Sequence, residues 1–408
     1  MRRWDAVIVG AGPAGAATAC HLAGAGARVL VIDRTRFPRH KPCSEYLSPE
    51  TTRLLERLGG DVLSAVERAA PARLYGMKVI APNGVEMCGR FSADHGYPSP
   101  RPYSFALPRI TFDMILREAA ERAGAVVWED AAVEELSSEH GAIDGVRVRT
   151  GGGKREVVEA RVVVAADGLH SLVARRLRLA RRSAPTRIAF TAHVADVAGV
   201  DGLGELHVGH CGYVGLGPIG GGVTTVALVL PLAALRQHPR DVRARFFAEL
   251  ERFPGLRGRF APQRQVREVL VTGPFARWSR RAVADMGGAL LVGDAADFFD
   301  PFTGQGIYSA LRGAELAASV LVPALERSGP LTRAVLAPYA AARRAAFAGK
   351  WVLERLIGLG VGWPALTNRV VGRLARRPHL ADLVVGATGN FVPARRVLSP
   401  GVLAQLFW

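Results

Sequence analysis

The feature that most constrains this chain is a glycine-rich turn near its N-terminus, G-A-G-P-A-G at residues 10–15. An apolar run at Asp5–Gly10 leads into the turn and predicts a buried parallel strand, and the alanine-rich stretch Pro13–Ala25 predicts a helix. A second apolar run, Arg28–Asp33, completes a β-α-β unit that should have a right-handed crossover. The chain therefore begins as an α/β protein with parallel strands.

The same turn predicts a ligand. Gly10 permits the tight turn out of the strand, Gly12 lets the backbone approach a pyrophosphate, and Gly15 lets the helix pack closely on the sheet. The pyrophosphate would lie at the helix N-terminus, where free N–H groups favour anions. Asp33 can accept hydrogen bonds from ribose hydroxyls and would repel a 2′-phosphate, which favours FAD or NAD over NADP. The predicted dinucleotide cradle consists of Gly10, Gly12, Pro13, Ala14, Gly15, Asp33 and Arg34.

Two later segments also place a carboxylate at the end of a predicted strand. Residues 162–171 read VVVAADGLHS, and residues 290–310 read LLVGDAADFFDPFTGQGIYSA. Open α/β sheets bind ligands at the carboxyl ends of their strands, so Asp167 and Asp294 are candidate binding residues. A carboxylate at Asp294 can accept hydrogen bonds from the polyol chain of a flavin. The helix that follows can stabilise negative charge on a reduced flavin ring.

In this order the three segments resemble the group A flavoprotein superfamily, which includes para-hydroxybenzoate-hydroxylase-type monooxygenases and geranylgeranyl-reductase-like enzymes. The resemblance covers residues 4 to about 320. It implies an α/β fold with a Rossmann-type FAD-binding domain, an interleaved β-sheet substrate domain and a C-terminal helical region over the substrate cavity. It also implies FAD as the bound cofactor. The chain has no second dinucleotide motif, so NADH or NADPH is expected as a transient electron donor.

The resemblance further implies roles for individual residues. Asp167 and Gly168 would touch FAD and the path of the donor, Asp294 would bind ribityl or ribose oxygens, and Gly304–Gly306 would lie at the isoalloxazine edge. Arg109, in LPRITFDMIL, matches an arginine that contacts the cofactor. The remaining cofactor-binding residues predicted from these segments are Gly293, Pro301 and Gln305, and Pro301 is also predicted to act in catalysis.

Hydrophobic periodicity gives a division of the chain. A long loop is predicted at Thr35–Pro49, and a helix at Thr111–Ala123. The FAD-binding domain is predicted at residues 1–75, 109–180 and 276–330, the substrate domain at 76–108 and 181–275, and the helical region at 331–408.

Two segments bear on the reaction. KPCSEYLSP at Lys41–Pro49 resembles a loop of the geranylgeranyl-reductase-like branch that passes near the flavin, with Ser44 where glycine is usual. Cys43 in this loop is predicted to be catalytic, with packing as the alternative. GYVGLGPIG at Gly212–Gly220 resembles a strand of the same branch, but Gly215 replaces an aromatic residue that lines the substrate cavity. This departure favours another reaction over double-bond reduction.

Composition limits the partners. The formal net charge is +17, yet nearly all basic residues are arginines spread along the chain, and no nucleic-acid-binding motif is present, so no specific nucleic-acid partner is expected. Four cysteines without CxxC or metal-ligand spacing predict neither a disulfide framework nor a metal site and suit a reducing cytoplasm. The apolar, arginine-rich tail at residues 351–408 is interpreted either as a lid or peripheral membrane contact, or as an ordinary helical cap. The oligomeric state is not specified.

Three functions follow. The first is an NAD(P)H-dependent monooxygenase that hydroxylates a hydrophobic aromatic or polyketide-like substrate. The second is a flavin-dependent reductase or dehydrogenase of carbon–carbon double bonds in an isoprenoid or other lipid, which KPCSEYLSP suggests. The third is a flavin-binding scaffold without catalytic activity.

Overall fold

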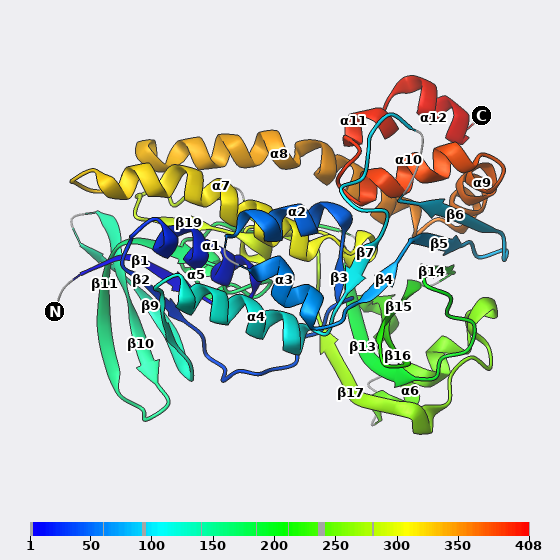
Figure 1. Ribbon diagram of the computed structural model, residues 1–408, viewed down its shortest axis with the longest axis horizontal. Coiled ribbons are helices and arrows are strands. Elements are labelled where there is room, and N and C mark those ends of the chain that lie inside the picture. Colours follow the sequence, from blue (N-terminus) through cyan, green and yellow to red (C-terminus); the bar gives the residue numbers. More distant parts are fainter. Residues whose placement is uncertain are drawn as a thin grey trace.

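The computed structural model describes residues 3–59, 61–91, 95–139, 141–184, 186–210, 212–235, 241–279 and 281–407. Cys211, one of the four cysteines, falls outside these ranges. Two large sheets lie at opposite ends of the molecule, and the long helices α7 (Gly306–Glu326) and α8 (Arg333–Gly360) run along one side (Figure 1). The site described below lies where the two sheets approach each other.

The first sheet contains the predicted β-α-β unit. Its strand order is β8-β2-β1-β11-β10-β9, and β19 pairs with β11. The C-terminal part of β11 runs parallel to β1 and β19, whereas its N-terminal part forms an antiparallel hairpin with β10. The strands are β1 (Trp4–Val9), β2 (Val29–Ile32), β8 (Val126–Trp128), β9 (Ala131–Glu139), β10 (Ala142–Thr150), β11 (Arg155–Ala165) and β19 (Ala289–Leu291).

The parallel strands are apolar throughout because both faces of this sheet are covered. Ile8, Val31 and Val164 pack on one side against the helices, and Val7, Leu30 and Val163 pack on the other side. The helices on the first side are α1 (Pro13–Gly24), α2 (Pro49–Arg57), α3 (Val62–Arg68), α4 (Arg109–Arg122) and α7, and α5 (Leu172–Arg176) lies near β9.

The second sheet is formed by segments far apart in the chain. Its order is β17-β13-β16-β15-β14-β5-β6, with only β14 and β5 paired in parallel. One face packs on α6 (Val242–Leu250), and Tyr213, Val229 and Ala189 on the opposite face belong to the same apolar cluster as residues of the C-terminal region. The strands are β5 (Gly76–Ile80), β6 (Glu86–Arg90), β13 (Arg187–Ala195), β14 (Gly204–Gly209), β15 (Gly212–Gly220), β16 (Val223–Pro231) and β17 (Gln265–Thr272).

Short elements connect the two sheets. Two three-stranded sheets are formed by β3 (Tyr46–Leu47), β7 (Ser104–Ala106) and β4 (Ala72–Leu74), and by β12 (Ala180–Arg182), β18 (Arg277–Ser279) and β20 (Asp297–Phe298). The 3₁₀ turns are η1 (Leu232–Leu235), η2 (Pro254–Leu256), η3 (Pro262–Arg264), η4 (Gly293–Ala295) and η5 (Pro301–Thr303).

The C-terminal region is helical, as predicted. Leu374, Leu380 and Val385 pack with Met87 and Phe91, so this region covers the β5–β6 side of the second sheet. Its helices are the end of α8, α9 (Pro364–Ala375), α10 (Pro378–Thr388), α11 (Ala394–Val397) and α12 (Pro400–Phe407) (Figure 1). Among the described residues, none of the helices combines the length and hydropathy that a membrane span requires.

The predicted fold class is confirmed, with one local correction. The segment Thr35–Pro49 is not a loop throughout, because Tyr46 and Leu47 form β3 and pair with Ala106 and Phe105. Both residues are buried, and this contact at long sequence separation is not visible in the local pattern. The domain boundaries proposed from the sequence stay predictions.

Candidate flavin site

Four parallel strands of the first sheet end at the same edge. The glycine-rich turn follows β1, Asp33 follows β2, Asp167 follows β11, and Asp294 follows β19. The fold thus brings together three carboxylates and a helix N-terminus from segments separated by up to about 280 residues of chain. This edge is the expected position of a ligand site in an open α/β sheet.

The three glycines of the turn have different surroundings. Gly10 has φ +101°, and a Cβ there would lie 2.5 Å from the Ala166 carbonyl oxygen. A Cβ on Gly15 would lie 1.8 Å from the Gly10 oxygen, so this glycine is required for the close packing of α1. At Gly12, by contrast, the nearest atom is Arg39 Nη2 at 3.8 Å. Space is therefore left at the one glycine whose predicted role is to admit a pyrophosphate.

Asp33 connects the turn to the next strand. One of its oxygens accepts a hydrogen bond from Ala11 N at 2.8 Å, and the other accepts from Thr35 N and Thr35 Oγ1 at 2.9 and 2.6 Å. A carboxylate has about four acceptor sites, so Asp33 keeps capacity for a ribose hydroxyl. Arg34 is exposed beside it, while Pro13 and Ala14 are buried in the first turn of α1.

The two carboxylate oxygens of Asp167 differ in their hydrogen bonding. Oδ2 accepts from Leu172 N at 2.6 Å and from Val173 N at 3.3 Å, which fixes the start of α5. Oδ1 is buried and, among the described residues, has no hydrogen-bond partner. Burial raises the pKa of this carboxyl. Gly168, with φ +76°, has open space where a Cβ would lie.

Asp294 is the most perturbed carboxyl at this edge. Burial raises its pKa to about 6, while the positive charges of Lys41 and Arg109 act in the opposite direction. The guanidinium of Arg109 is itself held by Asp113, with Nε–Oδ1 and Nη2–Oδ2 distances of 2.7 and 2.9 Å. Asp113 also binds Arg39 Nη1 at 3.1 Å, so a chain of charges connects Asp294 with the dinucleotide cradle.

The segment after Asp294 bends around the start of α7. Gly293 has φ +58° and packs against Ala14. Gly304 has φ +67°, and a Cβ at this position would lie 3.2 Å from the Tyr46 ring. Gln305 is buried and accepts a hydrogen bond from Asn390 Nδ2, while its own Nε2 has no partner in the described part of the chain. The sequence-predicted residues Pro301 and Gly306 begin η5 and α7.

A cluster of polar side chains lies where this segment meets the second sheet; we call it the seam cluster. It consists of the half-buried Cys43 and the buried Glu45, His193 and Arg267. Glu45 Oε2 lies 2.7 Å from His193 Nε2, and Glu45 Oε1 lies 3.4 Å from Arg267 Nη1. Glu45, His193 and Arg267 are 1%, 7% and 6% exposed. Cys43 Sγ accepts from Glu45 N at 3.3 Å. Arg109 N donates a hydrogen bond to Glu45 Oε1 at 3.2 Å, so the seam cluster and the flavin edge are in contact.

The sequence predicts the seam cluster only in part. Cys43 is predicted to be catalytic, whereas Glu45, His193 and Arg267 are not predicted as site residues, and neither are Arg39 and Lys41 at the flavin edge. The available signal was KPCSEYLSP, in which Lys41 and Glu45 flank the cysteine. His193 and Arg267 lie in ordinary strand sequences, and only the pairing of β13 with β17 brings them to Glu45.

The residues present fit FAD. Along the sheet edge, the strand order β2-β1-β11-β19 places Asp33, the space at Gly12, the unpartnered Asp167 Oδ1 and Asp294 in succession, which is the order of the ribose, pyrophosphate and flavin-side contacts expected from the sequence. Gln305, whose Nε2 has no partner in the described part of the chain, precedes α7 beside this edge. When bound, FAD would supply hydride transfer, and the chain would supply binding and orientation.

The chain is similar to several known proteins. The chain is 30% identical over 342 residues to the menaquinone reductase of Mycolicibacterium smegmatis, covering 78% of this chain and 76% of that protein. It is 27% identical over 353 residues to the 1H-pyrrole-2-carbonyl-[peptidyl-carrier protein] chlorinase of Pseudomonas fluorescens, covering 80% and 77%. It is 30% identical over 334 residues to the digeranylgeranylglycerophospholipid reductase of Methanothrix thermoacetophila, covering 79% and 78%.

Among solved structures, a flavoprotein/dehydrogenase from Cytophaga hutchinsonii has the same fold, with a TM-score of 0.84, 19% identity, and coverage of 98% of this chain and 96% of that one. The FAD binding domain family matches residues 3–352. The chain therefore belongs to the FAD binding domain family and is an FAD-dependent oxidoreductase.

Proposed function

We propose that this protein is a reductase of carbon–carbon double bonds in an isoprenoid or related lipid, using NADH or NADPH as electron donor. The main support for this proposal is the position of the seam cluster, which lies between the flavin edge and the second sheet. Two relatives that are 30% identical are named as reductases, and one of these names contains a geranylgeranyl lipid. Hydroxylation, the first hypothesis from the sequence, has no comparable support.

The face of the second sheet toward the flavin suits an apolar substrate. Side chains alternate along each strand, so Tyr213, Gly215 and Gly217 share one face of β15. Val208, Val229 and Ala189 lie in the same apolar cluster as Tyr213. A Cβ on Gly215 would have Leu206 at 3.6 Å as its nearest neighbour, and one on Gly217 would have Thr225 at 3.5 Å. A Cβ at either position would make only ordinary contacts, so close packing does not require these glycines. We propose that a chain-like substrate lies along this face, where bulky residues would shorten its space.

Reduction of a double bond adds a hydride to one carbon and a proton to the other. The hydride is the chemistry that FAD supplies, so the protein must hold the proton. Glu45 Oε2 and His193 Nε2 lie within hydrogen-bond distance at 2.7 Å, and the Arg267 guanidinium lies beside them, with Nη1 3.4 Å from Glu45 Oε1. Cys43, the predicted catalytic residue, lies between this pair and Arg109. We assign proton supply to this set, with Cys43 nearest the flavin edge.

A lipid substrate requires a route from the membrane, and the end of α8 supports one. Val352, Leu356 and Leu359 are 49%, 50% and 62% exposed, at a spacing that places them on one face of α8, and Trp363, in the turn that leads to α9, is 64% exposed. The adjoining Gly358 oxygen accepts a hydrogen bond from Arg187 at 2.7 Å, so this patch is joined to β13 of the second sheet. We therefore propose a peripheral membrane contact here.

The membrane contact is testable with vesicles that contain anionic lipid. The double variant Leu359→Ser/Trp363→Ser should sediment with vesicles markedly less than the unaltered protein. Val266→Ser/Val271→Ser removes two exposed apolar residues from β17 and serves as the control. Equal sedimentation of both variants and the parent would contradict the proposed patch.

The reaction itself is tested with the FAD-loaded protein under anaerobic conditions. Addition of NADH or NADPH should bleach the flavin absorbance, and a lipid with an unsaturated isoprenoid chain should restore it. Mass spectrometry of the lipid should then find two added hydrogen atoms. A product with one added oxygen atom, formed only in air, would support the hydroxylation hypothesis instead. A protein that binds FAD but is not reduced by either donor would support the scaffold hypothesis.

A further inference from the structure

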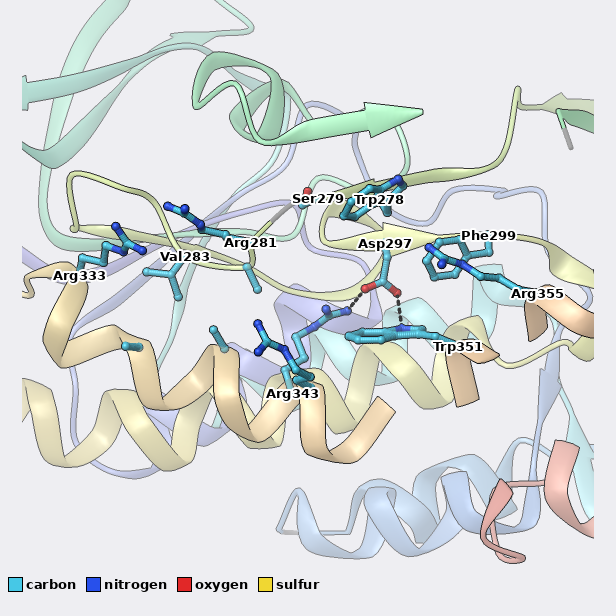
Figure 2. Close-up of a pocket in the computed structure, with 14 residues that line it drawn as sticks. Trp278, Ser279, Arg281, Val283, Asp297, Phe299, Arg333, Arg343, Trp351 and Arg355 are labelled. Carbon is cyan, nitrogen blue, oxygen red and sulfur yellow. Dashed lines mark hydrogen bonds and ion pairs between the residues drawn. The ribbon is translucent and has the colours of Figure 1, made fainter. Parts of the chain in front are cut away.

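A second pocket lies outside the flavin edge, between α8 and the strands β18 and β20 (Figure 2). Its volume is about 380 Å³, which lies within the range of small-molecule sites. Gly10, Asp33 and Asp167 do not line it, so it is separate from the dinucleotide cradle. It borders the segment that follows Asp294 through Asp297, the residue that begins β20, and through Phe299.

The pocket is strongly basic. Five arginines line it, namely Arg281, Arg333, Arg343, Arg344 and Arg355. Asp285 pairs with Arg281 and with Arg333, the latter at 3.5 Å, and Asp297 pairs with Arg343. Within the described part of the chain Arg344 and Arg355 have no acidic partner. Five positive charges thus face two carboxylates, which leaves an excess that favours an anionic ligand.

The two ends of the pocket differ in the side chains that line them. Arg281 and Arg333 lie together at one end, and Trp278, Phe299 and Trp351 lie toward the other (Figure 2). Trp351 Nε1 donates to Asp297 at 3.2 Å, which fixes the indole in place. The Arg355 guanidinium already stacks over Phe299 at 4.4 Å from the ring centre. Aromatic faces of this kind bind planar rings, and guanidinium groups bind phosphates.

Arg343 provides a separate indication of a ligand. It is only 6% exposed, and its guanidinium stacks against Phe347 and Trp351 at 5.3 Å each. Asp297 accepts from Nη2, but the buried Nε has no hydrogen-bond partner among the described residues. A buried donor without a partner is costly, and a ligand oxygen in this pocket would satisfy it.

We propose that this pocket binds a nucleoside phosphate, with the base among the aromatic residues and the phosphate among the arginines. The same chemistry is present in a free nucleotide and in the adenosine end of NADH or NADPH. The inference does not depend on the proposed reductase activity, because it rests on residues outside the flavin edge and the seam cluster.

The test is isothermal titration calorimetry on the protein with FAD bound, so that the dinucleotide cradle is filled. ADP should bind, and adenosine and inorganic phosphate should each bind at least about tenfold more weakly, since each lacks one half of the ligand. NADP⁺ and ADP titrated in competition distinguish the two sources. Stronger binding of NADP⁺ assigns the pocket to the electron donor, and stronger binding of ADP assigns it to a free nucleotide.

Two double variants locate the binding. Arg333→Ala/Arg344→Ala removes two exposed pocket arginines and should weaken ADP binding at least about tenfold. Arg373→Ala/Arg376→Ala removes two arginines from the end of α9, outside the pocket, and should leave the affinity unchanged within about twofold. Absence of ADP binding, equal binding of adenosine or phosphate, or equal loss in both double variants would overturn the proposal.

Discussion

The flavin edge and the seam cluster lie next to each other but are built in opposite ways. At the flavin edge, each functional residue lies just after a strand formed by the residues that precede it in sequence. Gly12 follows β1, and Asp294 follows β19. At the seam cluster, Glu45 meets His193 and Arg267 across 148 and 222 residues of chain. The first region depends on local backbone geometry, and the second depends on the correct docking of two sheets.

This difference predicts different responses to mutation. Changes at Gly12 or Asp294 of the flavin edge should weaken cofactor binding and leave the fold, because these positions are predicted to contact the ligand. Changes in the seam cluster should affect stability as well as reaction, because its charges are buried and satisfy one another. The following experiments test that contrast, from the largest expected effect to the smallest.

Gly12→Val should weaken FAD binding by roughly a thousandfold or more, because the side chain would occupy the space kept for the pyrophosphate. The apoprotein should keep its melting temperature, since no atom lies within 3.8 Å of the new Cβ. FAD titration by fluorescence and a thermal scan measure the two effects. Gly24→Val, where nothing lies within 4 Å, is the control and should bind FAD normally. A yellow Gly12→Val protein after purification would show that the cradle is misplaced.

Glu45→Ala should lower the free energy of unfolding by about 3 kcal/mol, because it leaves Arg267 buried without its carboxylate partner. Chemical denaturation of the apoprotein measures this loss. Glu86→Ala removes an exposed glutamate from β6 and should change stability by less than about 0.5 kcal/mol. If both variants unfold alike, the seam cluster contributes nothing to the docking of the sheets.

Gly215→Phe should reduce kcat/KM for a long isoprenoid substrate by about tenfold, because the ring would occupy the apolar face of β15. FAD affinity should not change. Gly401→Phe places the same ring on exposed α12 and is the matched control. Unchanged turnover in Gly215→Phe would mean that the substrate lies elsewhere.

FAD affinity should also depend on pH through Asp294. The pKa of this carboxyl is raised to about 6, and a carboxylate accepts hydrogen bonds from ribityl hydroxyls better than a protonated carboxyl does. Lowering the pH from 7 to 5.5 protonates it, so the FAD dissociation constant should rise by roughly fourfold. Asp294→Asn should bind less tightly at pH 7 and lack this dependence. A pH profile shared by both proteins would exclude Asp294 as its source.

The sequence was sufficient where function follows local pattern. The β-α-β unit, the cradle and the two later strand ends could all be predicted, because a buried strand followed by glycine or aspartate has few alternative structures. The partners of Glu45 could not be predicted, because the pairing of β13 with β17 fixes them and no local pattern encodes it. The same holds for the pocket beside α8, whose arginines come from the loop after β18 and from α8. From the sequence, Gly215 in place of an aromatic residue favours another reaction over double-bond reduction. In the structure, a Cβ at this position on the apolar face would have Leu206 at 3.6 Å as its nearest neighbour.

The parallel pairing of β14 with β5 has a consequence for biosynthesis. β5 ends at Ile80, and its neighbour β14 starts at Gly204, roughly 120 residues later, so at about 5–20 residues per second the ribosome needs roughly 6–25 s to supply the partner. The first sheet also waits for β19, which ends at Leu291. A nascent chain therefore carries two unfinished sheets at once, and it can complete its FAD site only after Asp294 and the start of α7 at Gly306 have been synthesised.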